Sequence, residues 1–339
     1  MREIAKLQAA LVVVGLIAAG CGGTTSTKSS QTTAAPTSST SLSTAAKNLF
    51  PQGITLVSNL GPGGPNYTSA SVLQPYLQSV LDVPVTVRPV LGGGGNTAAQ
   101  YVYNSSPNSG ILMMSYLPQL PVGELVGNGA YKTLKYTPLA GLFGNDTSIY
   151  VSKYGSQYQN FASLRDSKST VTIGVFGVKS SAGWMSAQFL ANVNHIKVAT
   201  VPYANAAQSV DGVLSGAVDL ASVTSAQALP LIAAKKIQPV VEFAPRALSY
   251  LPGTESIAQV GSPNEAFFNL MGLDGPPNMS SAAVRVLTQA LSLVEKAPSY
   301  QASAKKVSLT PTYEDASAWM ASETNAYNLV KSHLSTLDG

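Results

Sequence analysis

The sequence predicts an α/β fold with two lobes, each a mainly parallel β-sheet flanked by helices. Short β-branched segments alternate with helical segments along most of the chain, which is the pattern of parallel strands covered by helices. The 339 residues are enough for two lobes with separate cores. The chain has 45% hydrophobic and 11% charged residues, as globular exported proteins do and disordered chains do not.

The first 21 residues predict an export signal. Arg2 and Lys6 precede an apolar run at 7–19 that is too short to span a membrane. The small residues at 18–20 come directly before Cys21, the single cysteine. They resemble a bacterial lipoprotein cleavage box, although an alanine stands where leucine is more usual, and the resemblance implies lipid attachment to the Cys21 sulfur. The alternative is a buried thiol in an uncleaved apolar anchor.

Residues 22–47 predict a disordered tether between this signal and the folded body. They are almost all Thr, Ser, Ala and Gly, and Leu42 is the one large apolar side chain. Such a composition buries too little apolar surface to fold. The protein body would then lie outside the cytoplasmic membrane, anchored to it through Cys21.

The body divides into lobe 1, residues 48–147 and 268–339, and lobe 2, residues 148–267. In lobe 1 we expect strands at 54–58, 83–89 and 111–115, helices at 69–81 and 96–104, and after the return from lobe 2 a strand at 267–273 and helices at 281–296, 299–307 and 313–334. In lobe 2 we expect strands at 147–152, 171–176, 198–202, 220–223 and 240–243, and helices at 181–193, 206–215 and 226–234.

Three loops at the carboxyl ends of predicted strands have the chemistry of an anion site. The first, in the segment ITLVSNLGPGGPNYT at 54–68, exposes glycine backbone before a helix start. The second, GVFGVKSSAG at 174–183, adds a lysine and hydroxyls, and the third, VPYANAAQ at 201–208, adds a tyrosine and an asparagine. Ligands of open α/β sheets bind at such edges. The alternative for the first loop is a plain tight β–α connection.

The body resembles the Bug family, the extracytoplasmic solute receptors of tripartite tricarboxylate transporters. The likeness runs from about residue 53 to 334 and rests on the order of several segments: ITLVSNLGPGGPNYT, RPVLGGGGN at 88–96, SPNSGILMMS at 106–115, TPLAGLF at 137–143, VPYANAAQSVDGVLSGAVDL at 201–220 and ALPLIAAKKIQPV at 228–240. It implies a periplasmic-binding-protein fold of type II, which holds one small carboxylate between its lobes.

The resemblance also implies where the ligand lies and which partners the protein has. We expect ligand contacts from the three loops and the end of the strand at 111–115: Gly63, Gly64, Pro65, Asn66, Tyr67, Thr68, Tyr116, Gly177, Val178, Lys179, Ser180, Ser181, Tyr203, Ala204 and Asn205. The implied partners are a small mono- or dicarboxylic acid, aromatic acids included, and the membrane permease subunits. We expect a monomer.

Three departures from the family pattern bear on specificity. Tyr67 stands where relatives commonly have an acidic residue, and Lys179 stands where they usually have glycine. Ala204 and Asn205 replace a common Lys-Gly pair. Lys179 would either pair with a ligand carboxylate or face solvent from its loop.

Other functions find little support in the sequence. The net charge of +4 is dispersed, without the basic cluster of a nucleic-acid-binding protein. His195 and His333 lie far apart and outside the three loops, so we expect no metal site, cofactor or histidine-based catalysis. The remaining alternatives are a sensor that presents bound solute to a membrane signalling partner and, less favoured, an envelope hydrolase.

Overall fold

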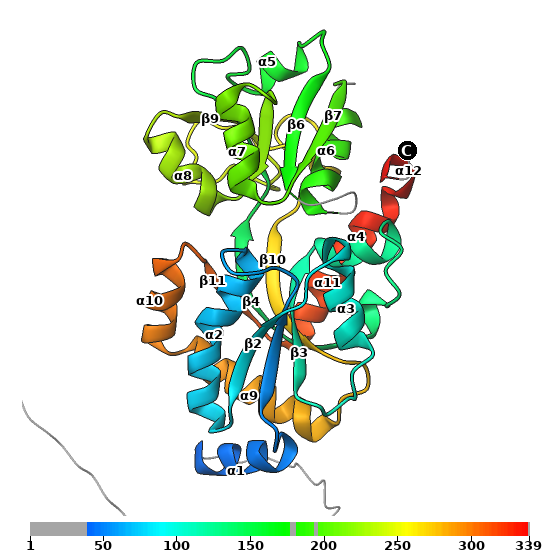
Figure 1. Ribbon diagram of the computed structural model, residues 1–339, viewed down its shortest axis with the longest axis vertical. Helices are drawn as coiled ribbons and strands as arrows, with labels where there is room; N and C mark the ends of the chain where they lie inside the picture. The colour runs from blue at the N-terminus through cyan, green and yellow to red at the C-terminus, as the bar shows by residue number, and fades with distance from the viewer. Residues whose placement is uncertain (1–38, 177–180, 193–195, 338–339) are drawn as a thin grey trace, which may run out of the picture. The chain divides into compact units, whose positions relative to one another are not determined.

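The computed structural model describes residues 39–176, 181–192 and 196–337. Within these residues the chain forms two β-sheets with helices on both faces (Figure 1). The first sheet has the order β11 (Pro311–Glu314), β4 (Thr137–Asp146), β10 (Asn269–Gly275), β3 (Ile111–Leu117), β1 (Ile54–Ser58) and β2 (Val85–Pro89). The second has the order β7 (Val198–Tyr203), β6 (Val171–Phe176), β8 (Leu220–Val223), β5 (Ile149–Lys153) and β9 (Ile237–Glu242).

Both sheets are mixed, so the expectation of mainly parallel sheets is corrected. Strand β1 pairs in parallel with β2 and β3, and β6 pairs in parallel with β7 and β8. The chain passes between the sheets from β4 to β5 and from β9 to β10, and all the described pairings of β4, β5 and β10 are antiparallel. Parallel pairs need a crossover helix, and these passages are made without one.

In lobe 1, two groups of helices cover the two faces of the first sheet. Successive residues of β1 alternate between them: Leu56 belongs to one apolar cluster and Val57 to the other. One face is covered by α1 (Ser39–Leu49), α2 (Pro65–Leu81), α9 (Ser281–Glu295) and α10 (Pro298–Lys306). The other is covered by α3 (Asn96–Tyr103), α4 (Gln119–Leu125) and α11 (Ala316–Ser332).

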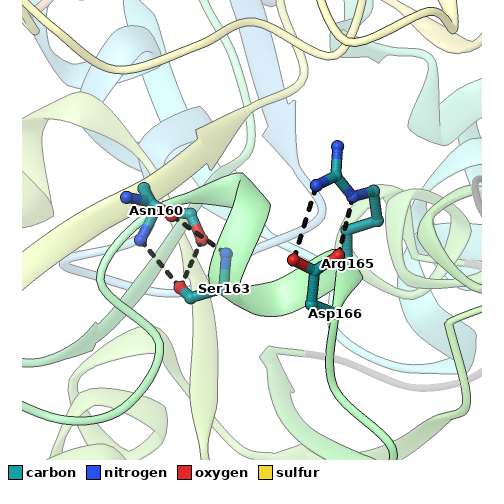
Figure 2. Close-up of polar contacts among 4 residues, drawn as sticks. All are labelled: Asn160, Ser163, Arg165 and Asp166. Carbon is teal, nitrogen blue, oxygen red and sulfur yellow. Dashed lines mark hydrogen bonds and ion pairs between the residues drawn. The ribbon is translucent and has the colours of Figure 1, made fainter.

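In lobe 2, α5 (Phe161–Arg165) and α6 (Ala182–Asn192) pack in one apolar cluster, while α7 (Ala206–Ser215) and α8 (Ser225–Ala233) pack in the other. Figure 2 shows how the short α5 begins and ends. The Asn160 side chain accepts a bond of 2.9 Å from the Ser163 amide, and Ser163 Oγ accepts one from the Asn160 amide. At the other end, Arg165 Nε donates to Asp166 at 2.9 Å, which lowers the pKa of the Asp166 carboxyl.

The tether predicted for residues 22–47 is wrong from residue 39 onward, because α1 occupies Ser39–Leu49. Leu42, Ala46 and Phe50 recur at intervals of four and are buried in the first apolar cluster. That spacing places Leu42 and Ala46 on one helix face, and Phe50 directly follows the helix. In Figure 1 α1 lies beside the ends of α2 and α9, which it contacts. Residues 22–38 and Cys21 lie outside the described residues, so the rest of the tether and the lipidation stay predictions.

The end of the chain departs from its expected place in lobe 1. The predicted helix at 313–334 is divided into β11, α11 and α12 (Leu334–Leu337). Val330 and Leu337 are buried in the lobe 2 cluster that contains Phe189. His333 packs on the Phe189 ring, with centroids 4.8 Å apart, and its Nε2 lies 3.4 Å from a Glu265 oxygen. The C-terminal residues therefore join the two lobes.

Sequence reasoning also missed β11, at the edge of the first sheet, and β4 beside it. Gly141 of β4 and Gly272 of β10 leave room for the buried Trp319 ring of α11. The Trp319 Nε1 donates to Asp274 Oδ1 at 2.9 Å, and Ser115 Oγ donates to the other Asp274 oxygen. Among the described residues, no helix combines the length and apolar character needed to cross a membrane.

Candidate functional site

The first loop leads from β1 into α2 and forms one wall of a cavity of about 810 Å³. The Gly64 amide donates to the Gly61 carbonyl at 3.0 Å, which tightens the turn, and Pro65 begins the helix. Gly63 has φ +84°, and a Cβ on Gly64 would lie 2.6 Å from the Leu60 Cβ. Both positions therefore require glycine, and the loop presents bare backbone to the cavity.

The third loop, between β7 and α7, lines the same cavity from lobe 2. The Asn205 side chain accepts a 2.9 Å bond from the Gln208 amide, and the Gln208 side chain accepts one of 3.3 Å from the Ala204 amide. These bonds fix the start of α7. Gly63, Gly64 and Pro65 thus line one cavity together with Ala204 and Asn205, so the structure brings these predicted residues together.

A second cavity, of about 520 Å³, adjoins the first and shares Leu60 and Ala204 with it. The predicted residues Tyr116, Ser181 and Tyr203 line it. Ser181 is buried, and its Oγ accepts a bond of 3.2 Å from the Trp184 amide, which caps α6. Burial and the Asp146 carboxylate raise the pKa of Tyr116, so its hydroxyl stays protonated and can donate a hydrogen bond.

Four predicted residues lie outside the described part of the chain: Gly177, Val178, Lys179 and Ser180. Three others line none of the described cavities: Asn66, Tyr67 and Thr68. The Asn66 side chain is buried and donates to the Met114 carbonyl at 3.0 Å, which ties α2 to β3. Tyr67 and Thr68 are half-buried on α2. The ligand roles of all seven residues stay predictions.

Sequence reasoning missed Gln119, the first residue of α4, which lines the 520 Å³ cavity and two smaller ones. Its Nε2 donates to the Gly94 carbonyl at 2.7 Å, and its Oε1 accepts a bond of 3.0 Å from the Ala182 amide in lobe 2. The signal was present in the sequence. Gln119 lies two residues after β3, near the carboxyl end of a strand that pairs in parallel with β1, where ligands of such sheets bind.

The glycine run at residues 92–95 also belongs to the site. It contains η1 (Gly93–Gly95) and lines the 520 Å³ cavity. All four residues have positive φ, between +58° and +120°. A side chain at Gly95 would meet the Asn59 side chain at 2.7 Å. The run thus forms a turn, and its backbone atoms form part of the wall of the 520 Å³ cavity.

A third cavity, of about 40 Å³, lies where the chain passes between the sheets. It shares Tyr116, Gln119 and Ser181 with the 520 Å³ cavity, and its other polar lining residues are Ser148, Ser222, Thr224, Gln227 and Asn269. The first residues of α6 also line it, and α8 starts next to Thr224. The positive ends of helix dipoles favour negative charge, so this chamber suits a small polar group.

Few charged side chains line these spaces. Among the described lining residues, the charged ones are Asp211 and Lys236, both exposed, in the 810 Å³ cavity. Asp146 lies nearby and accepts bonds from the Thr147 and Ser225 amides at 2.9 and 3.1 Å. Burial raises the pKa of Asp146, and these hydrogen bonds oppose that effect.

The titratable side chains of the described residues do not gather into a metal site. No group of three His, Cys, Asp or Glu side chains is placed to hold a metal ion there. His333 is engaged by Phe189 and Glu265, as described above, and His195 lies outside the described residues. The arrangement offers backbone, hydroxyl and amide groups, which bind a ligand by hydrogen bonding.

Comparison with known proteins agrees with this architecture. The structure is similar to that of the periplasmic binding protein BugD, with a TM-score of 0.72 and 16% identity over 84% of this chain and 97% of BugD. For an R. palustris protein with adipate, the TM-score is 0.72 and the identity 17%, over 84% of this chain and 97% of that protein. For MatC from Rhodopseudomonas palustris with bound malate, the TM-score is 0.68 and the identity 18%, over 84% of this chain and 97% of MatC. At these identities the likeness establishes the two-lobed fold alone.

The family follows from the sequence match. No curated protein sequence matches the chain. Residues 70–331, well over half of the chain, match the model of the tripartite tricarboxylate transporter family receptor, TctC. The protein therefore belongs to this family of solute-binding receptors, the one that the resemblance to Bug proteins indicates.

Proposed function

We propose that the protein binds one small organic carboxylate between its lobes and delivers it to a tripartite tricarboxylate-type permease. The observation that carries the proposal is a pair of adjoining cavities, of about 810 and 520 Å³, that residues of both lobes line: the glycine-rich first loop and the start of α7 in one, and the glycine run at 92–95 and Tyr203 in the other. Helix starts and exposed backbone amides are favourable places for an anion. A ligand that contacts both walls stabilises the closed form over the open one.

Family membership supports the choice of a carboxylate. Two structurally similar proteins have solved structures with carboxylates, one with adipate and one with malate. Delivery to a permease is what the family description implies for its receptors. Binding without chemical turnover fits the cavity lining, which consists largely of glycine, proline, aliphatic and amide residues.

A thermal-shift screen of the full-length protein against mono- and dicarboxylates tests the proposal. A ligand present at 100 times its Kd adds about 2.7 kcal/mol to the free energy of unfolding, a clear rise in Tm. NMR of the mixture should show the acid unchanged after prolonged incubation. If no acid raises the Tm, the carboxylate assignment fails, and conversion of the acid would show an enzyme instead.

We also propose that the protein is an extracytoplasmic lipoprotein anchored through Cys21. The support is the apolar run at 7–19 and the small residues directly before that cysteine. Metabolic labelling with an alkyne fatty acid should mark the wild-type protein and leave Cys21→Ser unlabelled and detached from membranes. Equal labelling of both proteins would contradict the anchor.

A further inference from the structure

The 520 Å³ cavity has an apolar character that bears on the identity of the ligand. Its described lining contains no Asp, Glu, Lys, Arg or His. The lobe 1 wall includes Leu60, Leu91 and the glycine run at 92–95, and the lobe 2 wall includes Pro202 and Tyr203. A cavity lined in this way suits the uncharged part of a ligand.

The glycine run keeps this wall free of side chains. Four consecutive residues with positive φ present main chain to the cavity, and a Cβ on Gly92 would lie 2.9 Å from Thr97 Oγ1. Leu91, next to the run, has 62% of its surface exposed. A single exposed leucine is ordinary on a protein surface. Leu91 is informative because it lines the same cavity as Tyr203 of the other lobe.

At its inner end the apolar cavity meets the polar 40 Å³ chamber. Tyr116, Gln119 and Ser181 line both spaces, so they form the neck between them. The chamber volume is enough for a few water molecules or one small polar group. A molecule that lies through the neck can therefore form hydrogen bonds at its end in the polar chamber and apolar contacts at its end in the 520 Å³ cavity.

We propose that the ligand is a monocarboxylate whose aliphatic or aromatic body fills the 520 Å³ cavity and whose carboxylate lies toward the neck. This inference rests on the proposed carboxylate binding. A second carboxylate in the apolar cavity would lose its hydration with no cation among the described lining residues to replace it, which is costly. An apolar body gains from leaving water there.

Hexanoate and adipate provide the test, because they share a six-carbon chain and differ in one terminal carboxylate. Isothermal titration of the full-length protein should show hexanoate binding at least about tenfold more tightly than adipate, with 3-phenylpropanoate on the side of hexanoate. Adipate binding as tightly as hexanoate, or more tightly, would overturn the inference and leave carboxylate binding intact. Absence of binding by every acid would overturn both.

A pair of leucine variants locates the apolar body. Leu91→Asn should weaken 3-phenylpropanoate binding at least fivefold, because it places an amide in the apolar wall. Leu293→Asn is the matched control: Leu293 is 47% exposed on α9 and lines none of the described cavities. The Kd of the Leu293→Asn variant for 3-phenylpropanoate should stay within twofold of the wild-type value. Equal effects of the two substitutions would place the body elsewhere and overturn the assignment.

Discussion

Gln119 joins the two lobes through Ala182: its side-chain oxygen on α4 accepts a 3.0 Å hydrogen bond from the Ala182 amide at the start of α6. The same side chain donates to the Gly94 carbonyl at 2.7 Å. One carboxamide thus connects the glycine run, α4 and the first turn of a lobe 2 helix. It does so at the neck between the apolar and polar cavities.

Gln119→Met should loosen this connection, because methionine keeps the length of the side chain and removes both hydrogen bonds. We expect faster hydrogen exchange at the Ala182 amide and a loss of about 1 kcal/mol in the free energy of unfolding. Hydrogen-exchange mass spectrometry and denaturant unfolding measure the two effects. Gln100→Met, at an exposed position on α3, is the control and should change neither. Unchanged exchange at Ala182 in the Gln119 variant would show that the link has no energetic role.

The buried carboxyls of lobe 1 predict a dependence of stability on pH. Burial and the neighbouring Asp274 carboxylate raise the pKa of Glu323 far above its ordinary value, so Glu323 is protonated in the folded protein at neutral pH. The folded state then holds a proton that the unfolded chain releases above its ordinary glutamate pKa. Stability from this group is fully present at acid pH and is lost as the pH rises toward the folded value.

Glu323→Gln tests this assignment, because glutamine is a permanently neutral substitute of the same size. The difference in Tm between pH 5 and pH 8 should shrink by about 2 °C or more, mainly through a higher Tm at pH 8. Glu255→Gln, at an exposed position, should leave the difference as it is in the wild type. A Glu323→Gln variant with the wild-type pH dependence would mean that Glu323 is ionised in the folded protein.

Gly272→Ala should be strongly destabilising, because the added Cβ would lie 2.4 Å from the Trp319 ring and 2.6 Å from the Ala140 carbonyl oxygen. Neither the buried ring nor the strand backbone can move aside easily. We expect a loss of about 2 kcal/mol or more in the free energy of unfolding, measured with urea. Gly61→Ala is the matched control, since a Cβ there meets nothing within 4 Å. Similar stability of the two variants would contradict the packing.

Helix α1 should contribute to the stability of the body rather than act as part of a tether. Leu42→Ala removes a buried side chain and should cost about 2 kcal/mol or more, measured by urea unfolding. Asn48→Ala, on the exposed side of the same helix, should have little effect. If both variants unfold like wild type, α1 is not docked in solution and the original tether boundary is right.

The strands whose bounds the sequence predicts correctly are short runs of mostly apolar residues. The bounds at 54–58, 171–176 and 220–223 agree with β1, β6 and β8. Strands β4 and β11 were missed, because β4 contains glycine and proline and β11 begins with proline, residues that weaken strand patterns. Helix α1 was missed because Leu42 and Ala46, its two buried apolar residues, stand in a Ser- and Thr-rich segment.

The part of the candidate site that the sequence predicts correctly consists of loops at the ends of strands. Gly63, Gly64, Ala204 and Asn205 lie in loops at strand ends, and they line one cavity. The Gln119 bond to Ala182 and the polar chamber at Ser148, Ser222 and Asn269 depend on how the two passages between the sheets bring distant segments together. That arrangement is tertiary, and no local pattern of propensity or spacing contains it.

The most direct test of ligand binding between the lobes is isothermal titration of a carboxylate identified by the thermal-shift screen into the Ala204→Trp variant. Ala204 is exposed and lines both large cavities, so an indole there should fill the binding space and leave the core intact. Ala162→Trp, at an exposed position on α5, is the control. We predict that Ala204→Trp raises the Kd at least about 100-fold, consistent with steric exclusion of the ligand, while Ala162→Trp binds like wild type. Wild-type affinity in the Ala204→Trp variant would contradict binding at this site.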